Sequence, residues 1–120
     1  MAKALPLPPI DELRRSFAYR SDGVLIWKRP LSKRAKPGQI AGTIYKRGYV
    51  HLKLQNRRLK AHRVIWALLK HEDPLDFEID HINGNKADNR IENLRKATHA
   101  QNQRNRYAAG FYPDGLRKKW

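Results

Sequence analysis

Hydrophobic and polar side chains alternate along residues 48–55. The apolar positions are Val50, Leu52 and Leu54. A period of two predicts a strand with one buried face and one solvated, basic face. Residues 40–45 and 48–55 flank the turn-forming Lys46-Arg47-Gly48, so we expect these two segments to pair as a hairpin. The next residues, Asn56-Arg57-Arg58, are expected to turn the chain.

The clearest helical pattern covers residues 61–71. Its apolar stripe consists of Val64, Ile65, Leu68 and Leu69. This spacing predicts the main core helix. A shorter helix is expected over residues 10–18, because apolar residues recur at helical spacing and acids occupy the first turn. Residues 24–28 form an apolar run that Pro30 ends, which predicts a strand.

The last third of the pattern begins with a short strand expected over residues 77–82, which leads into the turn Asn83-Gly84. Residues 87–94 predict a compact loop or a single helical turn. Thr98-x-x-Gln101 has the spacing of a capping box and predicts a final helix over about residues 99–106. Together these elements predict a small α+β fold in which an N-terminal helix and an antiparallel β hairpin pack on a core helix.

The expected domain organisation is simple. A chain of 120 residues has room for one small core. Residues 1–9 hold three of the seven prolines and are expected to form an irregular arm. Residues 10–106 are expected to form the domain, and residues 107–120 an extension too short to fold alone.

The charge is strongly unbalanced. There are 26 Lys and Arg against 11 Asp and Glu, which gives a net charge of +15. Basic residues are dispersed along the chain, as in proteins that follow a phosphate backbone, so the expected partner is a polyanion. Cysteine is absent, which excludes disulfides and thiol catalysis. No apolar run approaches the roughly 20 residues of a membrane span, and we expect a cytoplasmic protein with no membrane partner.

Candidate chemistry lies around Asp80-His81. Asn93 follows the histidine by twelve residues, and Asn102 follows nine residues later. This pattern resembles the HNH endonucleases, also called His-Me finger or ββα-metal nucleases, in the Asp-His…Asn…Asn version found in phage and intron-encoded homing enzymes. The resemblance covers roughly residues 10–106 and is strongest over 61–105. It implies a ββα-metal core over about residues 77–106, cleavage of double-stranded DNA, and a host-cell cytoplasmic location for a phage-encoded enzyme.

Each residue of this pattern suits one task in phosphodiester hydrolysis. His81 is the expected general base, because imidazole titrates near neutral pH. Asn93 is expected to accept a hydrogen bond from the other ring nitrogen and so orient the ring. Asp80 and Asn102 are expected to offer oxygen ligands to Mg²⁺, Mn²⁺ or another divalent cation. His99 lies three residues before Asn102 on the same helical face and is the alternative ligand.

Eight basic residues flank these positions and are candidate DNA contacts. They are Arg57, Arg58, Lys60, Arg63, Arg95, Lys96, Arg104 and Arg106. The expected protein is a monomer or homodimer. Two plainer interpretations remain open at this stage. Asp, His, Asn and Gly are common turn residues, so the motif alone is compatible with a hairpin end. The charge alone is compatible with a non-catalytic protein that binds DNA or RNA and keeps a structural remnant of the HNH motif.

Overall fold

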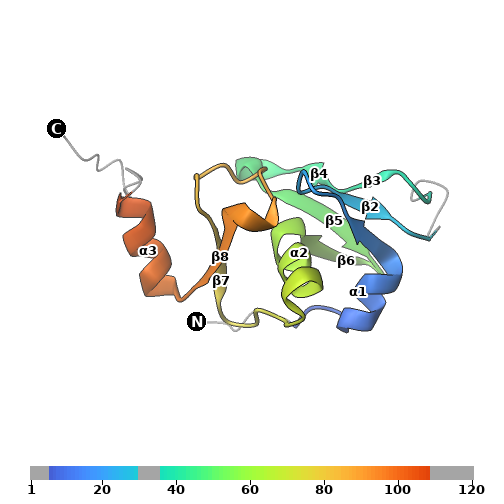
Figure 1. The fold of residues 1–120 in the computed structure, drawn as a ribbon, viewed down its shortest axis with the longest axis horizontal. Coiled ribbons are helices and arrows are strands. Elements are labelled where there is room, and N and C mark those ends of the chain that lie inside the picture. Colours follow the sequence, from blue (N-terminus) through green and yellow to red (C-terminus); the bar gives the residue numbers. More distant parts are fainter. Residues whose placement is uncertain (1–5, 30–35, 109–120) are drawn as a thin grey trace.

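The central element is helix α2, Ala61–Lys70. The computed structural model describes residues 6–29 and 36–108. In Figure 1, α2 lies between helix α1 with its small sheet on one side and the β7–β8 hairpin on the other. Three residues of the predicted apolar stripe of α2 are buried and Leu69 is partly buried, and Val64, Ile65 and Ala67 are fully enclosed. The helix ends at His71, whose left-handed φ of 58° stops the helical backbone.

The N-terminal part is a helix followed by a three-stranded antiparallel sheet. It comprises α1 (Ile10–Ser16), β1 (Phe17–Tyr19), β2 (Leu25–Trp27) and β3 (Ile40–Ala41). The helix is shorter than expected, because Phe17 begins a strand that pairs with β2. Phe17 and Trp27 pack in the core with ring centroids 4.8 Å apart. The predicted strand over residues 24–28 is therefore confirmed as β2.

A second antiparallel sheet follows directly. Its strands are β4 (Thr43–Ile44), β5 (Val50–Leu54) and β6 (Arg57–Lys60). Leu52 and Leu54 are buried and Lys53 is exposed, which confirms the predicted alternation. The turn is displaced from its expected place. Gln55 and Asn56 have φ of 52° and 64°, so they make the tight turn, and Arg57 and Arg58 belong to a strand that the sequence did not predict.

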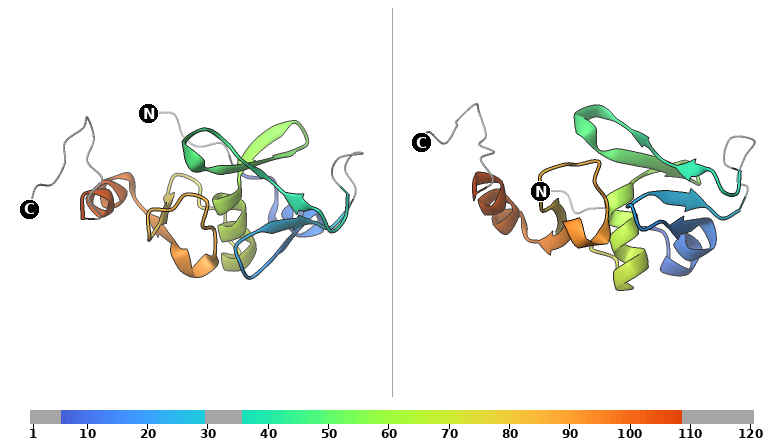
Figure 2. Two further views of the ribbon diagram at one scale, coloured as in Figure 1. Left: turned by 90° about the horizontal axis from the view of Figure 1, so that it is seen from above. Right: turned by 45° about the horizontal axis from the view of Figure 1, so that its top comes forward.

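The C-terminal part contains a two-stranded hairpin and a helix. Its elements are β7 (Glu78–His81), the 3₁₀ turn η2 (Ile91–Asn93), β8 (Leu94–Ala97) and α3 (His99–Ala108). The single helical turn was expected, but strand β8 was not. The capping box is confirmed, because the Thr98 amide donates to Gln101 Oε1 at 2.8 Å and the Gln101 amide to Thr98 Oγ1 at 3.1 Å. In both views of Figure 2, α3 stands away from the rest of the fold.

These elements confirm the expected small α+β fold with an N-terminal helix and a hairpin packed on a core helix. Within the described ranges, no helix combines the length and apolar character that a membrane crossing requires. The expected extension over 107–120 falls, from residue 109 on, outside the described residues.

Candidate active site

Strand β7 divides the predicted site into two sides. Ile79 and His81 are buried, whereas Glu78 and Asp80 on the opposite face are only partly buried. This division follows from the period-two geometry of a strand. The side chains of the adjacent residues Asp80 and His81 therefore lie on opposite faces of β7. Both residues are at the C-terminal end of the strand, where it leads into the loop 82–90.

His81 is buried and lies against an asparagine. Its Nε2 lies 2.7 Å from Oδ1 of Asn89, and the two residues are 7% and 2% exposed. Burial lowers the pKa of His81, with the Asn89 hydrogen bond acting in the opposite direction. The ring is therefore neutral at pH 7 and carries one N–H. An amide oxygen only accepts, so Nε2 carries the proton and Nδ1 has the free lone pair.

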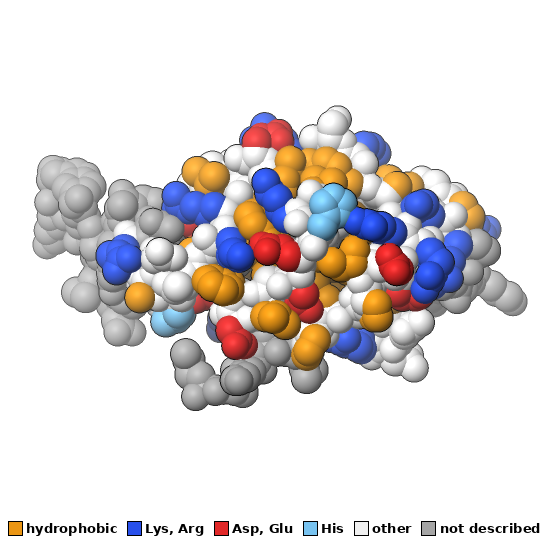
Figure 3. Space-filling model, turned by 60° about the horizontal axis from the view of Figure 1, so that its bottom comes forward, with side chains coloured by type: hydrophobic (Ala, Val, Ile, Leu, Met, Phe, Trp, Pro, Cys, Tyr) orange, Lys and Arg blue, Asp and Glu red, His pale blue; other side chains and the backbone are white. Residues whose placement is uncertain are grey.

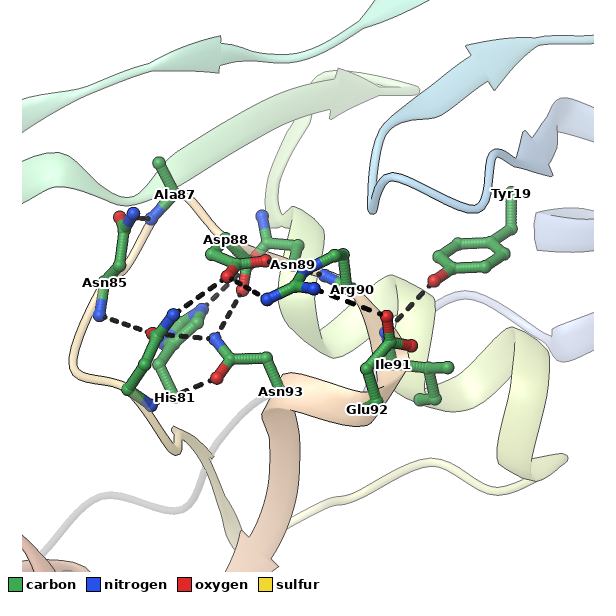
Figure 4. Close-up of polar contacts among 11 residues, drawn as sticks. Tyr19, His81, Asn85, Ala87, Asp88, Asn89, Arg90, Ile91, Glu92 and Asn93 are labelled. Carbon is green, nitrogen blue, oxygen red and sulfur yellow. Dashed lines mark hydrogen bonds and ion pairs between the residues drawn. The ribbon is translucent and has the colours of Figure 1, made fainter.

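Asn93 has a different role from the one the sequence suggested. Its Nδ2 donates to Asn83 Oδ1 and to the carbonyl of Asp88, both at 2.9 Å, and its Oδ1 accepts from the Asn83 amide at 3.0 Å. Figure 4 shows this side chain bridging the two ends of the loop. The expected hydrogen bond from His81 to Asn93 is therefore wrong, because Asn93 Oδ1 accepts from the Asn83 amide and His81 Nε2 lies against another side chain. Asn89 makes that contact instead.

The loop between β7 and η2 is cross-linked by its own short polar side chains. Asn83 Oδ1 accepts from the Asn85 amide at 2.8 Å, and Asn85 Oδ1 from the Ala87 amide at 3.0 Å. Asp88 accepts from Asn83 Nδ2 and pairs with Arg90 at 2.8 Å. Such side-chain to backbone bonds are the reason Asn and Asp favour turns. They give the loop a defined shape around His81.

On the other face of β7, polar groups connect the strand to β8 and α3. Asp80 Oδ2 accepts from Arg95 Nε at 2.9 Å and from Arg95 Nη2 at 2.8 Å, directly across the hairpin. Glu78 Oε1 accepts from Asn102 Nδ2 at 2.7 Å, and Glu78 Oε2 lies 2.6 Å from His99 Nδ1. The two expected metal ligands, Asp80 and Asn102, are thus both on the Glu78 side of β7.

The residue types on this face, a carboxylate and an amide, offer the oxygen atoms that suit a hard divalent cation. Asn102 Oδ1 is buried and has no hydrogen-bond partner among the described residues, whereas its Nδ2 is held by Glu78. An acceptor oxygen in that state favours a cation, and oxygen ligands are those that Mg²⁺ and Mn²⁺ prefer. Among the described residues, no group of three or more His, Cys, Asp or Glu is arranged to hold a metal. The fit therefore rests on a carboxylate and an amide.

An aromatic wall closes the buried side of the site. The rings of His62 and His81 have centroids 4.9 Å apart, and Tyr49 stacks on His62 at 5.6 Å. Burial holds the pKa of His62 well below its usual value, so this ring adds no positive charge beside His81. Lys60 and Lys86 each place an ammonium 4.9 Å from the Tyr49 ring centroid. Both ammonium groups therefore lie beside the Tyr49 ring of this aromatic wall.

Three residues of the site escaped sequence analysis: Tyr49, Glu78 and Asn89. Glu78 lies two residues before Asp80, and a period-two count along β7 places both on one face. That signal could have found it. Asn89 and Tyr49 reach His81 only through tertiary packing, and no local pattern marks them.

Six of the eight predicted DNA contacts have partners within the protein. Arg63 donates to the carbonyls of Leu75 and Phe77, so it braces the entry to β7. Arg57 donates to the carbonyl of Pro6, Arg58 lies over the Tyr45 ring, and Lys60 lies over the Tyr49 ring. Arg95 pairs with Asp80, and Lys96 pairs with Glu72. Arg104 lines a cavity of about 350 Å³ between β8 and α3. Arg106 lies in α3, and its side chain is outside the described part.

A long part of the chain has no acidic residue. Residues 23–71 contain 13 of the 26 Lys and Arg and no Asp or Glu. On the outer face of the second sheet, Lys53 lies opposite Arg58 and His51 opposite Lys60. By contrast, the face shown in Figure 3 carries acidic side chains among the basic ones. The outer face of the second sheet is therefore a basic face without an acidic residue.

Comparison with known proteins relates these features to a family. The model of the HNH endonuclease family matches residues 59–104. These 46 of the 120 residues are similar to an HNH endonuclease domain. The expected resemblance to HNH endonucleases is thereby confirmed, and this match includes His81, Asn89, Asn93 and Asn102. A search of curated proteins gave no match.

The fold of the chain is similar to a solved structure described as DNA binding and cleavage by the HNH homing endonuclease I-HmuI. The TM-score is 0.58 at 23% sequence identity, over 88% of this chain and 59% of that chain. The likeness extends beyond the HNH domain to most of the N-terminal part. This chain thus spans a little over half the length of that homing endonuclease, and the likeness establishes a shared fold.

Proposed function

We propose that the protein is a divalent-metal-dependent endonuclease that hydrolyses phosphodiester bonds in double-stranded DNA, by nicking or by cutting both strands. One observation carries the proposal. Within an HNH domain, a buried neutral histidine is held by Nε2, and the carboxylate of the preceding residue lies on the face that also bears an unpartnered amide oxygen. Supporting this, the HNH domain belongs to a nuclease family.

His81 would act as the general base. Its Nδ1 carries the free lone pair, because Nε2 donates to Asn89. A neutral imidazole can accept a proton from water at pH 7, and a positioned base of this kind typically contributes about 10²–10⁴-fold to a rate. The resulting hydroxide would then attack phosphorus, while His81 keeps the proton that it took from the water. Burial keeps the base in its neutral form before this step.

Asp80 and Asn102 would hold the cation, with Glu78 fixing the Asn102 amide so that its Oδ1 is presented. When bound, a divalent cation stabilises negative charge on the phosphate and on the departing oxygen. Arg95 must share Asp80 with it, since its guanidinium pairs with that carboxylate. Mg²⁺ is the proposed ion and Mn²⁺ a substitute, because both take oxygen ligands. His99 is the alternative ligand.

The basic face of the second sheet would hold the DNA backbone. Lys53, Arg58 and Lys60 are exposed and lie on one face of the sheet, and no acid is present in residues 23–71. Cations that neutralise phosphates provide sequence-independent affinity. Arg104 on α3 would contact the DNA backbone on the other side of the site, and Arg106, whose side chain lies outside the described part, stays a predicted contact. A homing enzyme of phage or mobile-element origin, acting in the cytoplasm as a monomer or homodimer, is the type we propose from the likeness to I-HmuI.

A plasmid assay tests the proposal. Supercoiled plasmid is incubated with the full chain in Mg²⁺, in Mn²⁺ or in EDTA, with His81→Ala as the matched variant. We expect relaxed or linear plasmid only with the metal and the wild-type chain, while His81→Ala still binds a DNA duplex. Binding without cleavage in any divalent cation would overturn the proposal in favour of a non-catalytic nucleic-acid-binding protein, which the net charge of +15 also allows.

A further inference from the structure

We infer that Asn89 is a positioning residue for His81, and that the β1–β2 turn at Gly23 fixes the backbone of Asn89 by packing against it. The catalytic importance of this device rests on the proposed nuclease function, whereas the arrangement itself can be tested without activity. It extends the site to a turn in the N-terminal sheet, 36 residues before the segment that matches the HNH family, 59–104.

The contact between the two side chains is buried and short. Asn89 Oδ1 lies 2.7 Å from His81 Nε2, and the asparagine is 2% exposed. A bond between buried groups in a medium of low dielectric constant holds its geometry better than one in water. An imidazole ring can otherwise turn about its χ2 torsion, which is broad for an aromatic ring. Accepting from Nε2–H therefore fixes the direction in which Nδ1 faces.

The backbone of Asn89 is itself fixed by close packing. Gly23 has a φ of +87°, and a Cβ placed on it would lie 2.3 Å from the Arg90 nitrogen and 2.5 Å from the Asn89 carbonyl carbon. These are backbone atoms, which cannot move aside as a flexible side chain can. The Asn89–Arg90 peptide therefore packs directly on the turn, and only glycine leaves room for it.

The turn is defined by its own hydrogen bonds and by a neighbouring tyrosine. The Gly23 amide donates to the Arg20 carbonyl at 2.8 Å, and the Arg20 amide to the Val24 carbonyl at 2.9 Å. One strand earlier, the Tyr19 hydroxyl accepts from the Ile91 amide at 3.0 Å, two residues beyond Asn89. Figure 4 shows Tyr19 reaching this backbone from the N-terminal sheet. The packing of Gly23 and the hydrogen bond to Tyr19 thus fix the position of the backbone at Asn89.

The first experiment replaces the acceptor while keeping the size of the side chain. Asn89→Leu removes the oxygen, and Asn89→Asp retains one. The readout is the proton NMR signal of the His81 Nε2–H, assigned by its absence in His81→Ala and protected from exchange in the wild type. We expect the signal to remain in Asn89→Asp and to vanish in Asn89→Leu. Cleavage by Asn89→Leu should fall by about 10–100-fold, as for other orienting partners, with duplex affinity in EDTA unchanged.

The second experiment tests the packing of the Gly23 turn against this backbone and does not depend on the folding of Asn89→Leu. Gly23→Ala is compared with Gly38→Ala, because Gly38 has a similar φ of +85° but, within the described part of the chain, no non-neighbouring atom within 4 Å of its Cβ position. Both variants place an alanine at a similar positive φ. We expect only Gly23→Ala to weaken the Nε2–H signal and cleavage.

The outcomes separate the two proposals. A protected Nε2–H signal that persists in Asn89→Leu, or equal effects of Gly23→Ala and Gly38→Ala, would overturn the positioning role. Loss of the signal in Asn89→Leu, in a protein whose wild type does not cleave, would support the positioning role and refute the nuclease function.

Discussion

The two faces of β7 hold their polar groups in different ways. On the buried face, His81 is bound by a 2%-exposed asparagine inside a loop that Asn93 closes with three hydrogen bonds. On the other face, Asp80 pairs with an Arg95 side chain that is 42% exposed, and Glu78 with a His99 side chain that is 59% exposed. One face is a fixed buried network, and the other a set of partly solvated pairs.

This difference separates the two tasks of the proposed site. Surface ion pairs contribute about 0–1 kcal/mol each. The Arg95 and His99 side chains are exposed, whereas that of Asp80 is 12% exposed, so Arg95 and His99 are the partners that a cation or a phosphate would displace. Breaking the buried network would leave polar groups unsatisfied, at about 1–3 kcal/mol each. His81 is therefore held in place before the substrate arrives, whereas the side chains on the Asp80 and Glu78 face can rearrange around the bound substrate.

The largest effect should come from the buried face. His81→Ala should lower the rate of plasmid cleavage by about 10²–10⁴-fold, because the general base is lost. The rate is measured from the loss of supercoiled plasmid, and duplex affinity is measured in EDTA. His71→Ala, which alters an exposed histidine at the end of α2, is the control. Comparable losses in both variants would contradict the role of His81.

Next in size is the loss of a metal ligand on the other face. Asn102→Ala should reduce cleavage by about 100-fold or more, since even residues that only orient metal ligands contribute about 10–100-fold. Raising the Mn²⁺ concentration should restore part of the activity. Gln103→Ala, at the next position of α3, should behave as wild type. Full activity of Asn102→Ala together with an inactive His99→Ala would transfer the ligand role to His99.

The loop closure should contribute to stability more than to metal binding. Asn93→Ala removes three hydrogen bonds made by a 5%-exposed side chain to the loop that it closes, so the free energy of unfolding should fall by about 1–3 kcal/mol. Urea denaturation followed by circular dichroism measures it. Asn85→Ala, an exposed position in the same loop, should cost clearly less. An Asn93→Ala protein as stable as the wild type would show that the network is not a fixed one.

A smaller effect is expected on the basic face of the second sheet. Lys53→Gln should weaken duplex binding and make the log–log salt dependence shallower by about one, as for the loss of one phosphate contact. Affinity is measured in EDTA at several salt concentrations. Lys70→Gln, at the end of α2, is the control of equal charge change. If both variants change the salt slope equally, the surface has no directed binding face.

The smallest effect concerns Asp88 in the loop. Its pKa is held below the usual value, chiefly by the hydrogen bond from Arg90. A depressed pKa contributes stability above the unfolded pKa of about 3.9, and this contribution is lost as pH falls through the folded value. The melting temperature of Asp88→Asn should therefore be lower than that of the wild type at pH 7, and the two should converge in acid. Asp76→Asn, at an exposed position, is the control.

Sequence patterns predicted the elements that local chemistry determines. The stripe of α2, the alternation of β5 and the Thr98–Gln101 capping box each depend on residues a few positions apart. Strand β8 has the sequence Leu-Arg-Lys-Ala, which has no strong strand preference, and it is extended because it pairs with β7. Strand β6 was missed for a related reason, because two arginines after an asparagine suggested a longer turn.

At the site, the motif predicted which residues gather but not how they bond. Asn93 and Asn89 are the same residue type four positions apart in one loop, and only the path of the backbone decides which amide meets His81. That path depends on Gly23 and Tyr19, more than 60 residues earlier in the chain. Information at such a distance is absent from the spacing of a motif.

The close packing of Gly23 on the Asn89–Arg90 peptide has a consequence for protein engineering. A chimaera that carries residues 59–104 alone in another scaffold would keep all the motif residues. It would lose the turn at Gly23 against which the loop packs. A functional graft would have to begin no later than Tyr19.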